Sequence, residues 1–187
     1  MPISNEAKIY GYILGEILTA VSTFDQVSVK FAEQSKRNAY SFRLFDQAGE
    51  RCSFAVYVKT SSKRISPWRF TFLRDHQQEI ESLIASHDEV FLALVNGNDG
   101  VACFNYATLK MLLDEYFEDS EWISIRRKSG EQYTVAGKDG KLTGKLPLNE
   151  FPSAIVEFIE TALATGQHKQ TTQDVKSKSR RKLFGFL

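Results

Sequence analysis

The stretch at residues 53–59, Ser-Phe-Ala-Val-Tyr-Val-Lys, limits the fold of this chain more than any other. Its apolar, alternating residues predict a strand buried in a sheet. Lys59 ends this strand, and a polar, basic loop follows it. Functional sites in mixed sheets tend to open at such strand ends, although a lysine there is equally typical of a solvated strand end. Side chains alternate between faces, which puts Phe54, Val56 and Val58 on one face and Ala55, Tyr57 and Lys59 on the other.

The length and composition predict one globular domain. A chain of 187 residues is long enough to bury a single core without disulfide or metal support. Its 42% hydrophobic and 25% charged residues are ordinary for such a domain. No apolar run is long enough to span a bilayer, and residues 1–6 lack the basic flank and apolar core of a secretory signal. We therefore expect a cytoplasmic protein.

The cysteines and histidines argue against a metal centre. Cys52 and Cys103 each lie in a strand-like apolar run, where we expect them to be small buried side chains. His76, His87 and His168 have no ligand spacing relative to each other or to the cysteines. We expect no disulfide, no zinc site and no cofactor, because the sequence also lacks a phosphate-binding glycine loop that opens a helix.

The net charge of +1 hides an asymmetry between the body and the C-terminus. Residues 168–187 contain six Lys/Arg and one acid, so the rest of the chain has 18 basic and 22 acidic residues, a net charge of −4. A body of this kind does not bind duplex DNA with its whole surface. Any contact with nucleic acid is therefore expected to be local.

Hydrophobic periodicity predicts the remaining elements. Residues 5–22 have apolar side chains at helical spacing, and residues 89–95 are almost all apolar, as in an interior strand covered on both faces. The predicted fold class is mixed α/β (α+β). The expected order is a helix at 5–22, strands at 26–31, 40–45 and 53–59, a helix at 75–86, strands at 89–95 and 101–105, a helix at 106–117, a hairpin of 122–127 with 131–135, and a helix at 152–164.

The predicted order of a helix, a three-strand meander, a helix and a strand resembles the αβββαβ core of the PD-(D/E)XK nucleases, the restriction-endonuclease-like fold. Within that superfamily the chain looks most like the archaeal Holliday-junction resolvases. The resemblance covers residues 9–113 and implies a mixed central sheet flanked by helices. It rests on Gly15-Glu16-Ile17-Leu18 in the first helix, Tyr57-Val58-Lys59 at the place of the (D/E)-X-K motif, Gln77 at the start of the next helix, the strand at 90–95, and Cys103-Phe104-Asn105 leading into the helix of Leu109.

The resemblance implies metal-dependent phosphodiester cleavage, but the acidic residues of that site are largely missing. The family holds a divalent ion with clustered carboxylates, beside a lysine that positions or deprotonates water. Here Ser41 or Arg43 stands where the first acid belongs, and Tyr57 stands where the second belongs. Glu16 and Lys59 alone match the pattern. We expect these two side chains to face each other across a pocket, in a catalytic centre that is degraded and holds no metal.

The first functional hypothesis is a non-catalytic, nuclease-like domain over residues 1–166, with a hairpin and helix added at 120–165, that binds nucleic acid or a nucleoprotein partner. In the alternative interpretation Trp68 closes the edge of the core and the basic residues are merely solvated. Trp122 and the Arg126-Arg127-Lys128 turn form a lesser basic patch, read as an exposed hairpin end. The expected nucleic-acid-binding residues are Lys59, Lys63, Arg64, Trp68, Arg69 and Gln77.

Two further hypotheses remain open. One is a Mg²⁺-dependent nuclease whose acids have migrated, with Lys59 assisted by Glu16, Asp46 or Glu50. The other is an interaction module that acts through residues 167–187, which we expect to be a disordered basic tail with an apolar end. This tail suits an anionic membrane surface or a groove on a partner protein, or it is an inert solubilising segment. Its expected contact residues are Arg180, Arg181, Lys182, Leu183, Phe184 and Phe186.

Overall fold

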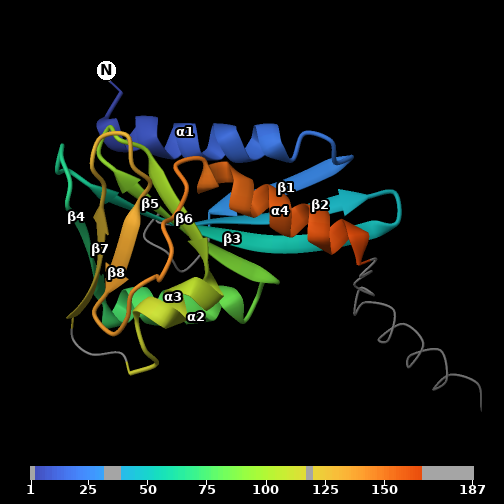
Figure 1. Ribbon diagram of the computed structural model, residues 1–187. Helices are drawn as coiled ribbons and strands as arrows, with labels where there is room; N and C mark the ends of the chain where they lie inside the picture. The colour runs from blue at the N-terminus through green and yellow to red at the C-terminus, as the bar shows by residue number, and fades with distance from the viewer. Residues whose placement is uncertain (1–2, 32–38, 117–119, 166–187) are drawn as a thin grey trace, which may run out of the picture.

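The computed structural model describes residues 3–31, 39–116 and 120–165 (Figure 1). Within these ranges it is a mixed α+β structure with a five-stranded sheet, a three-stranded sheet and four helices. The elements are α1 (Asn5–Ala20), β1 (Gln26–Phe31), β2 (Ala39–Asp46), β3 (Gly49–Ser61), β4 (Trp68–Leu73), α2 (Arg74–Ile84), β5 (Glu89–Asn96), β6 (Val101–Asn105), α3 (Tyr106–Leu112), β7 (Ser120–Arg126), β8 (Thr134–Gly137) and α4 (Glu150–Ala164).

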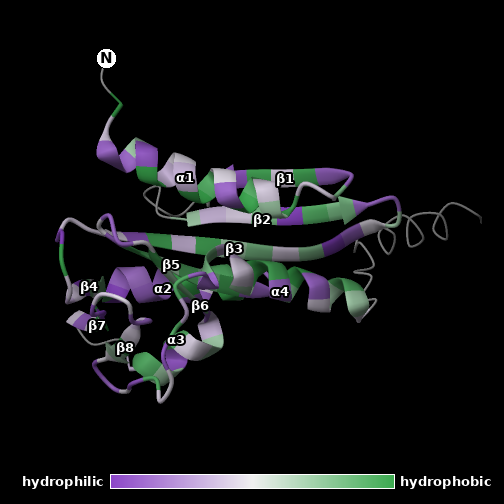
Figure 2. Cartoon of the chain, turned by 45° about the horizontal axis from the view of Figure 1, so that its top comes forward, coloured by the Kyte–Doolittle hydropathy of each residue, from purple (hydrophilic) through white to green (hydrophobic). Residues whose placement is uncertain are grey.

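The five-stranded sheet has the order β1-β2-β3-β5-β6. Strands β1, β2 and β3 form an antiparallel meander, β5 is parallel to β3, and β6 returns antiparallel to β5. The parallel pairing places Lys59 opposite Leu94. Strands β3 and β5 lie inside the sheet and are buried along most of their length, as their apolar sequences predict (Figure 2).

Helices cover both faces of this sheet (Figure 1). On one face α1 and α4 pack through Ile13, Ile17 and Ile155 against the side chains of β3 that include Phe54 and Val56. On the opposite face α2 and α3 pack against the side chains of Ala55 and Tyr57, together with the three-stranded sheet. Each helix has one apolar stripe, so it can bury only that stripe against the sheet. The two faces of β3 therefore belong to two separate core clusters.

The three-stranded sheet has the order β4-β7-β8 and is antiparallel throughout. The sequence predicted a hairpin of residues 122–127 with 131–135 as a separate late element; in the structure β7 also pairs with β4, over the full length of β4. Strand β4 alternates between buried and exposed positions, with Trp68, Phe70 and Phe72 turned toward the core and Arg69 and Thr71 turned outward.

The turn after β8 is held against the end of α3. The Asp139 amide donates to the Leu112 carbonyl oxygen at 3.1 Å. A Cβ atom at Gly137 would overlap that carbonyl oxygen, and one at Gly140 would overlap the carbonyl oxygen of Met111. Only glycine permits this close approach of two backbones, so the position of Asp139 relative to α3 is closely fixed.

Cys52 and Cys103 are free thiols, both buried in the core on the α1 side of the sheet. Burial raises the pKa of the Cys103 thiol above its ordinary value, with a smaller contribution from Glu150. The described residues contain no helix that is both long and apolar enough to cross a membrane.

Candidate functional site

Lys59 lies at the end of β3, where it contacts the first turn of α2. Its Nζ atom is 3.0 Å from His76 Nδ1 and 4.9 Å from the centre of the Phe72 ring. The backbone amide of Leu73 donates to the same Nδ1 atom at 3.1 Å. Because an amide can only donate, Nδ1 must be an acceptor, and an imidazole in this state carries its proton on Nε2. Lys59 is thus a second donor to a neutral imidazole.

The surroundings of Lys59 perturb its ionisation. Burial lowers the pKa of its ammonium group from 10.5 to about 8, although Asp75 and Glu79 act in the opposite direction. The hydroxyl of the buried Tyr57 donates to Glu79 Oε2 at 3.0 Å, which holds that carboxylate near the strand end. A lysine with such a pKa can exchange protons near neutral pH, which is a property of many functional lysines.

Glu16 does not face Lys59, so this expectation is wrong. Helix α1 packs on the other face of the sheet, through Ile13 and Ile17. Glu16 is part of that helix, whereas Lys59 shares its face with Tyr57 and contacts α2. The error came from the sequence itself, because an apolar stripe shows that a helix packs on a sheet but not on which face.

The hypothesis that Asp46 or Glu50 replaces a missing acid beside Lys59 is also wrong. Both lie at the opposite end of β3, and nine residues separate Glu50 from Lys59, which corresponds to about 30 Å along a strand. Asp46 accepts a hydrogen bond from the Ala48 amide at 2.8 Å, and Glu50 forms an ion pair with Arg43 at 3.0 Å. Both carboxylates are therefore parts of the β2–β3 hairpin and not of a site at Lys59.

Two of the expected nucleic-acid contacts, Trp68 and Gln77, are buried. The Trp68 indole packs in the core and donates through Nε1 to the Lys63 carbonyl oxygen at 3.0 Å. The Gln77 amide donates to the carboxylate of Glu121, which is also buried. Neither side chain is available for base stacking or phosphate binding, so these two assignments are corrected. For Trp68 the alternative interpretation, a ring that closes the core edge, is the one consistent with its burial.

The outer face of the β4–β7–β8 sheet, called the basic face below, unites the two basic patches that the sequence showed separately. Arg69 on β4 places its guanidinium 4.5 Å from the centre of the Trp122 ring on β7. Among the outward positions of the three strands no Asp or Glu is present. Five exposed cations belong to this face and its adjoining loops, and none forms a salt bridge with another described residue. They are Lys63, Arg64, Arg69, Arg126 and Lys128.

Arg127 anchors the end of the basic face to the larger sheet. Its guanidinium binds Asp99, in the turn between β5 and β6, through Nε at 2.7 Å and Nη2 at 2.5 Å. This pairing lowers the pKa of the Asp99 carboxyl below its ordinary value. The Arg127 amide also donates to Ser66 Oγ at 3.0 Å, which ties the hairpin to the loop of Lys63 and Arg64.

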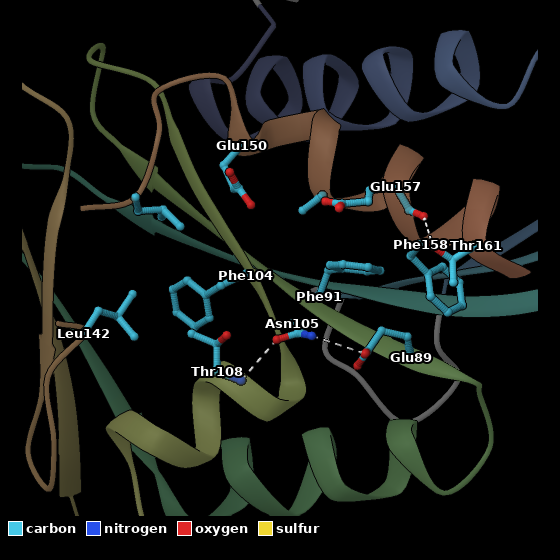
Figure 3. Close-up of a pocket in the computed structure, with 12 residues that line it drawn as sticks. Glu89, Phe91, Phe104, Asn105, Thr108, Leu142, Glu150, Glu157, Phe158 and Thr161 are labelled. Carbon is cyan, nitrogen blue, oxygen red and sulfur yellow. Dashed lines mark hydrogen bonds between the residues drawn. The ribbon is translucent and has the colours of Figure 1, made fainter. Parts of the chain in front are cut away.

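A cleft of about 450 Å³ lies at the β6 edge of the larger sheet, between α3 and α4. Figure 3 shows Glu150 and Glu157 on the α4 side and Glu89 on the opposite side, around the rings of Phe104 and Phe158. The lining has no Lys or Arg among the described residues. Burial, followed by the charge of Glu157, raises the pKa of the Glu150 carboxyl. Carboxylates around aromatic rings suit an organic cation with an apolar body.

The expected tail contacts lie outside the described residues; they are Arg180, Arg181, Lys182, Leu183, Phe184 and Phe186. No family model, curated protein or solved structure matches the chain.

Sequence reasoning missed two groups of acidic residues. One group lines the cleft, and the other, Asp114, Glu121 and Asp139, lies beside Gln77. The members of each group come from separate segments of the chain with no common spacing. Sequence reasoning also missed the basic face as one surface, although the alternation of Arg69 and Thr71 between aromatic residues was a visible signal.

Proposed function

We propose that this chain is a non-catalytic protein of the restriction-endonuclease-like fold that binds single-stranded nucleic acid through the basic face. The fold part is supported by the order α1-β1-β2-β3-α2-β5, by the antiparallel meander, and by β5 parallel to β3. It is also supported by α1 and α2 on opposite faces of the sheet. The chain departs from the αβββαβ plan where β4 leaves the sheet to pair with β7.

The absence of a carboxylate pair at the expected place supports the non-catalytic part of the proposal. At the motif position Tyr57 is fully buried and bound to Glu79. On β2 the Ser41 hydroxyl is bound to His87, and Arg43 is bound to Glu50. Mg²⁺ needs clustered oxygen ligands to replace part of its hydration shell, and these side chains do not provide them.

The observation that carries the binding part is the Arg69–Trp122 stack within a field of five exposed cations. Proteins that bind single strands without sequence preference combine a basic surface, which follows the phosphates, with rings on which bases stack. In our proposal Arg69, which pairs with Ser124, and Arg126, four residues along β7 from Trp122, contact phosphates on the same side of the Trp122 ring. A base would stack against the Trp122 ring or against the guanidinium that already covers it.

A sheet face with a half-buried ring favours a single strand over a duplex. Bases in a duplex are stacked on each other, so a surface ring cannot reach their planes without unpairing them. Among the described residues the basic face is formed by strands and loops, without a helix that could enter a major groove. We therefore expect an oligothymidine strand to bind more tightly than a duplex of the same length.

Fluorescence anisotropy with a labelled oligothymidine tests this proposal. We expect Trp122→Ala to weaken binding by about 5-fold to 150-fold, the equivalent of one lost stacked base at about 1–3 kcal/mol. We expect the double variant Arg69→Gln/Arg126→Gln to reduce the salt dependence, the slope of log K against log[salt], by about 1.4, or about 0.7 for each lost phosphate contact. The matched control is Lys30→Gln, which removes an exposed cation from β1, in the other sheet.

Two outcomes would count against the proposal. Equal weakening by Lys30→Gln and by the double arginine variant would mean that binding reflects net charge and not the basic face. A wild-type dissociation constant of about 10⁻⁴ M or weaker at physiological salt, which is the non-specific range, would rule out the proposed function. The same samples are incubated with Mg²⁺ or Mn²⁺. Cleavage that disappears in Lys59→Ala would replace the non-catalytic proposal with an active nuclease.

A further inference from the structure

Three carboxylates from different parts of the chain converge beside the inner side of the β4–β7–β8 sheet. Asp114 follows α3, Glu121 lies near the start of β7, and Asp139 lies in the turn after β8. One carboxylate oxygen from each residue lies within 4.8 Å of the other two. We call this group the acidic cluster. It lies on the α3 side of the small sheet and shares no residue with the basic face or with the cleft at β6.

Backbone contacts hold the acidic cluster together. The Asp114 amide donates to Asp139 Oδ2 at 3.2 Å, and the Asp139 amide donates to the Leu112 carbonyl oxygen at 3.1 Å. The close packing of Gly137 on Leu112 fixes the same turn. These contacts place two aspartates side by side on rigid segments, and the exposed side chain of Asp139 leaves the group accessible from solvent.

Glu121 is the buried member of the acidic cluster. Its side chain has no solvent exposure, and its Oε2 atom accepts a hydrogen bond from Gln77. Its Oε1 atom is buried without a hydrogen-bond partner among the described residues. The neighbouring aspartates cannot help when ionised, because a carboxylate only accepts. A buried carboxylate without compensation is strongly unfavourable, so this atom requires either a cation or a proton.

Lys110, a lysine near the cluster, pairs with a carboxylate outside it. Lys110 directs its ammonium group to Glu81 Oε1 at 3.2 Å and to the Asp114 carbonyl oxygen at 3.3 Å. It therefore contacts the backbone of Asp114 and pairs with a carboxylate on α2. The cluster offers oxygen ligands only, which is the preference of hard divalent ions and not of zinc.

We propose that Asp114, Glu121 and Asp139 bind a hard divalent cation, Ca²⁺ or Mg²⁺, with Gln77 orienting the Glu121 carboxylate. The cation satisfies the buried Oε1 atom and removes the repulsion among three negative charges. Water molecules on the exposed Asp139 side complete its coordination. The ion fastens the end of α3 and the turn after β8 to the first residues of β7. This role is independent of nucleic-acid binding.

Isothermal titration calorimetry and thermal unfolding of the full chain, with CaCl₂ and with MgCl₂, test the proposal. We expect saturable binding of one ion with a dissociation constant of about 1 mM or lower, the weak end of protein calcium sites. The transition temperature rises with ion concentration, because the ion binds the folded state. Asp139→Asn keeps a side-chain oxygen that can accept from the Asp114 amide but removes one negative charge. It weakens ion binding by about tenfold or more, a loss that is typical even of residues that only orient metal ligands. The matched control Glu160→Gln, an exposed acid on α4, leaves binding unchanged.

The variant Glu121→Gln distinguishes a cluster that binds a cation from one that binds a proton. If a cation is the partner, this variant loses the ion-dependent rise in transition temperature. The proposal is overturned if neither ion binds up to about 10 mM, ten times the weak end of calcium sites. It is also overturned if Asp139→Asn and Glu160→Gln bind the ion equally well. A third result would also overturn it: Glu121→Gln is more stable than wild type, and neither ion changes the transition temperature of the wild type. In that case a proton, and not a cation, occupies the cluster.

Discussion

Replacement of Lys59 by methionine tests the electrostatic character of the strand end. Methionine keeps an unbranched, apolar stem of similar size beside Phe72 and removes the ammonium group. Since burial is the main cause of the lowered Lys59 pKa, the charged form is less favourable in the folded protein than in the unfolded chain. We therefore expect Lys59→Met to stabilise the protein at neutral pH, even though it loses the contact with His76.

The expected magnitude follows from the pKa difference. A fall from 10.5 to about 8 corresponds to at most about 3 kcal/mol, at about 1.4 kcal/mol per pKa unit. Between these two values the unfolded chain binds more protons at Lys59 than the folded protein does. The Lys59 contribution to the free energy of unfolding therefore rises with pH across this window. Below about pH 8 the full cost of the buried charge is present, and above about pH 10.5 it is absent.

Urea unfolding of wild type and Lys59→Met between pH 7 and 10, followed by far-ultraviolet circular dichroism, measures this difference. Other groups titrate in the same range, and burial raises the pKa values of Cys103 and Tyr10, which lowers stability as the pH rises. Their effects cancel when the two proteins are subtracted at each pH. Lys30→Met, an exposed replacement on β1, is the control for the loss of any lysine.

The reasoning is refuted if the difference between Lys59→Met and wild type is the same at pH 7 and at pH 10. It is also refuted if Lys59→Met is less stable than wild type by more than about 1.5 kcal/mol at pH 7, the upper end of a typical net hydrogen bond. In that case the contacts of the ammonium group with His76 and the nearby acids would outweigh the cost of its burial.

Two further substitutions, one of them with a matched control, test the packing that positions the sites. Gly137→Ala is expected to lower the free energy of unfolding by more than about 2 kcal/mol, because its Cβ would overlap the Leu112 carbonyl oxygen. The control Gly144→Ala has open space around its Cβ and is expected to change stability by less than about 1 kcal/mol. Urea unfolding measures both variants. Tyr57→Phe removes the hydrogen bond to Glu79 and is expected to cost about 1 kcal/mol in the same assay. A larger loss for Gly144→Ala than for Gly137→Ala, or no loss for Tyr57→Phe, would contradict these contacts.

The strands of the larger sheet were predictable because their sequences repeat with the period of the structure. Alternation at residues 26–31 and 40–45 and the apolar run at 89–95 all became strands at those places. The C-terminal end of the central strand was predicted to within two residues, since the sequence ended it at Lys59 and β3 ends at Ser61; its start was predicted four residues late, at residue 53 instead of Gly49. What local pattern cannot supply is the partner of a strand. The pairing of β4 with β7 joins segments about fifty residues apart, and no turn signal links them.

Predicting the candidate sites required knowing which way each side chain points. A sequence pattern determines this only within one helix or strand. Trp68 and Trp122 illustrate this point. The sequence placed both near basic residues, but alternation with Phe70 and Phe72 puts Trp68 inside, whereas alternation with Ile123 and Ile125 leaves Trp122 outside. Glu121 breaks the apolar pattern of its own face, because it is buried beside Gln77. Such a break, a charged residue at an inward position, is the signal that marks the acidic cluster.

Strand β7 links the two proposed sites, because consecutive residues of a strand point to opposite faces. Glu121 is directed toward the acidic cluster and Trp122 toward the basic face. Their Cα atoms are separated by one peptide unit, about 3.8 Å, but the carboxylate and the ring point away from each other. The two proposals stay separable, because Trp122→Ala leaves the three carboxylates intact and Asp139→Asn leaves the five exposed cations intact.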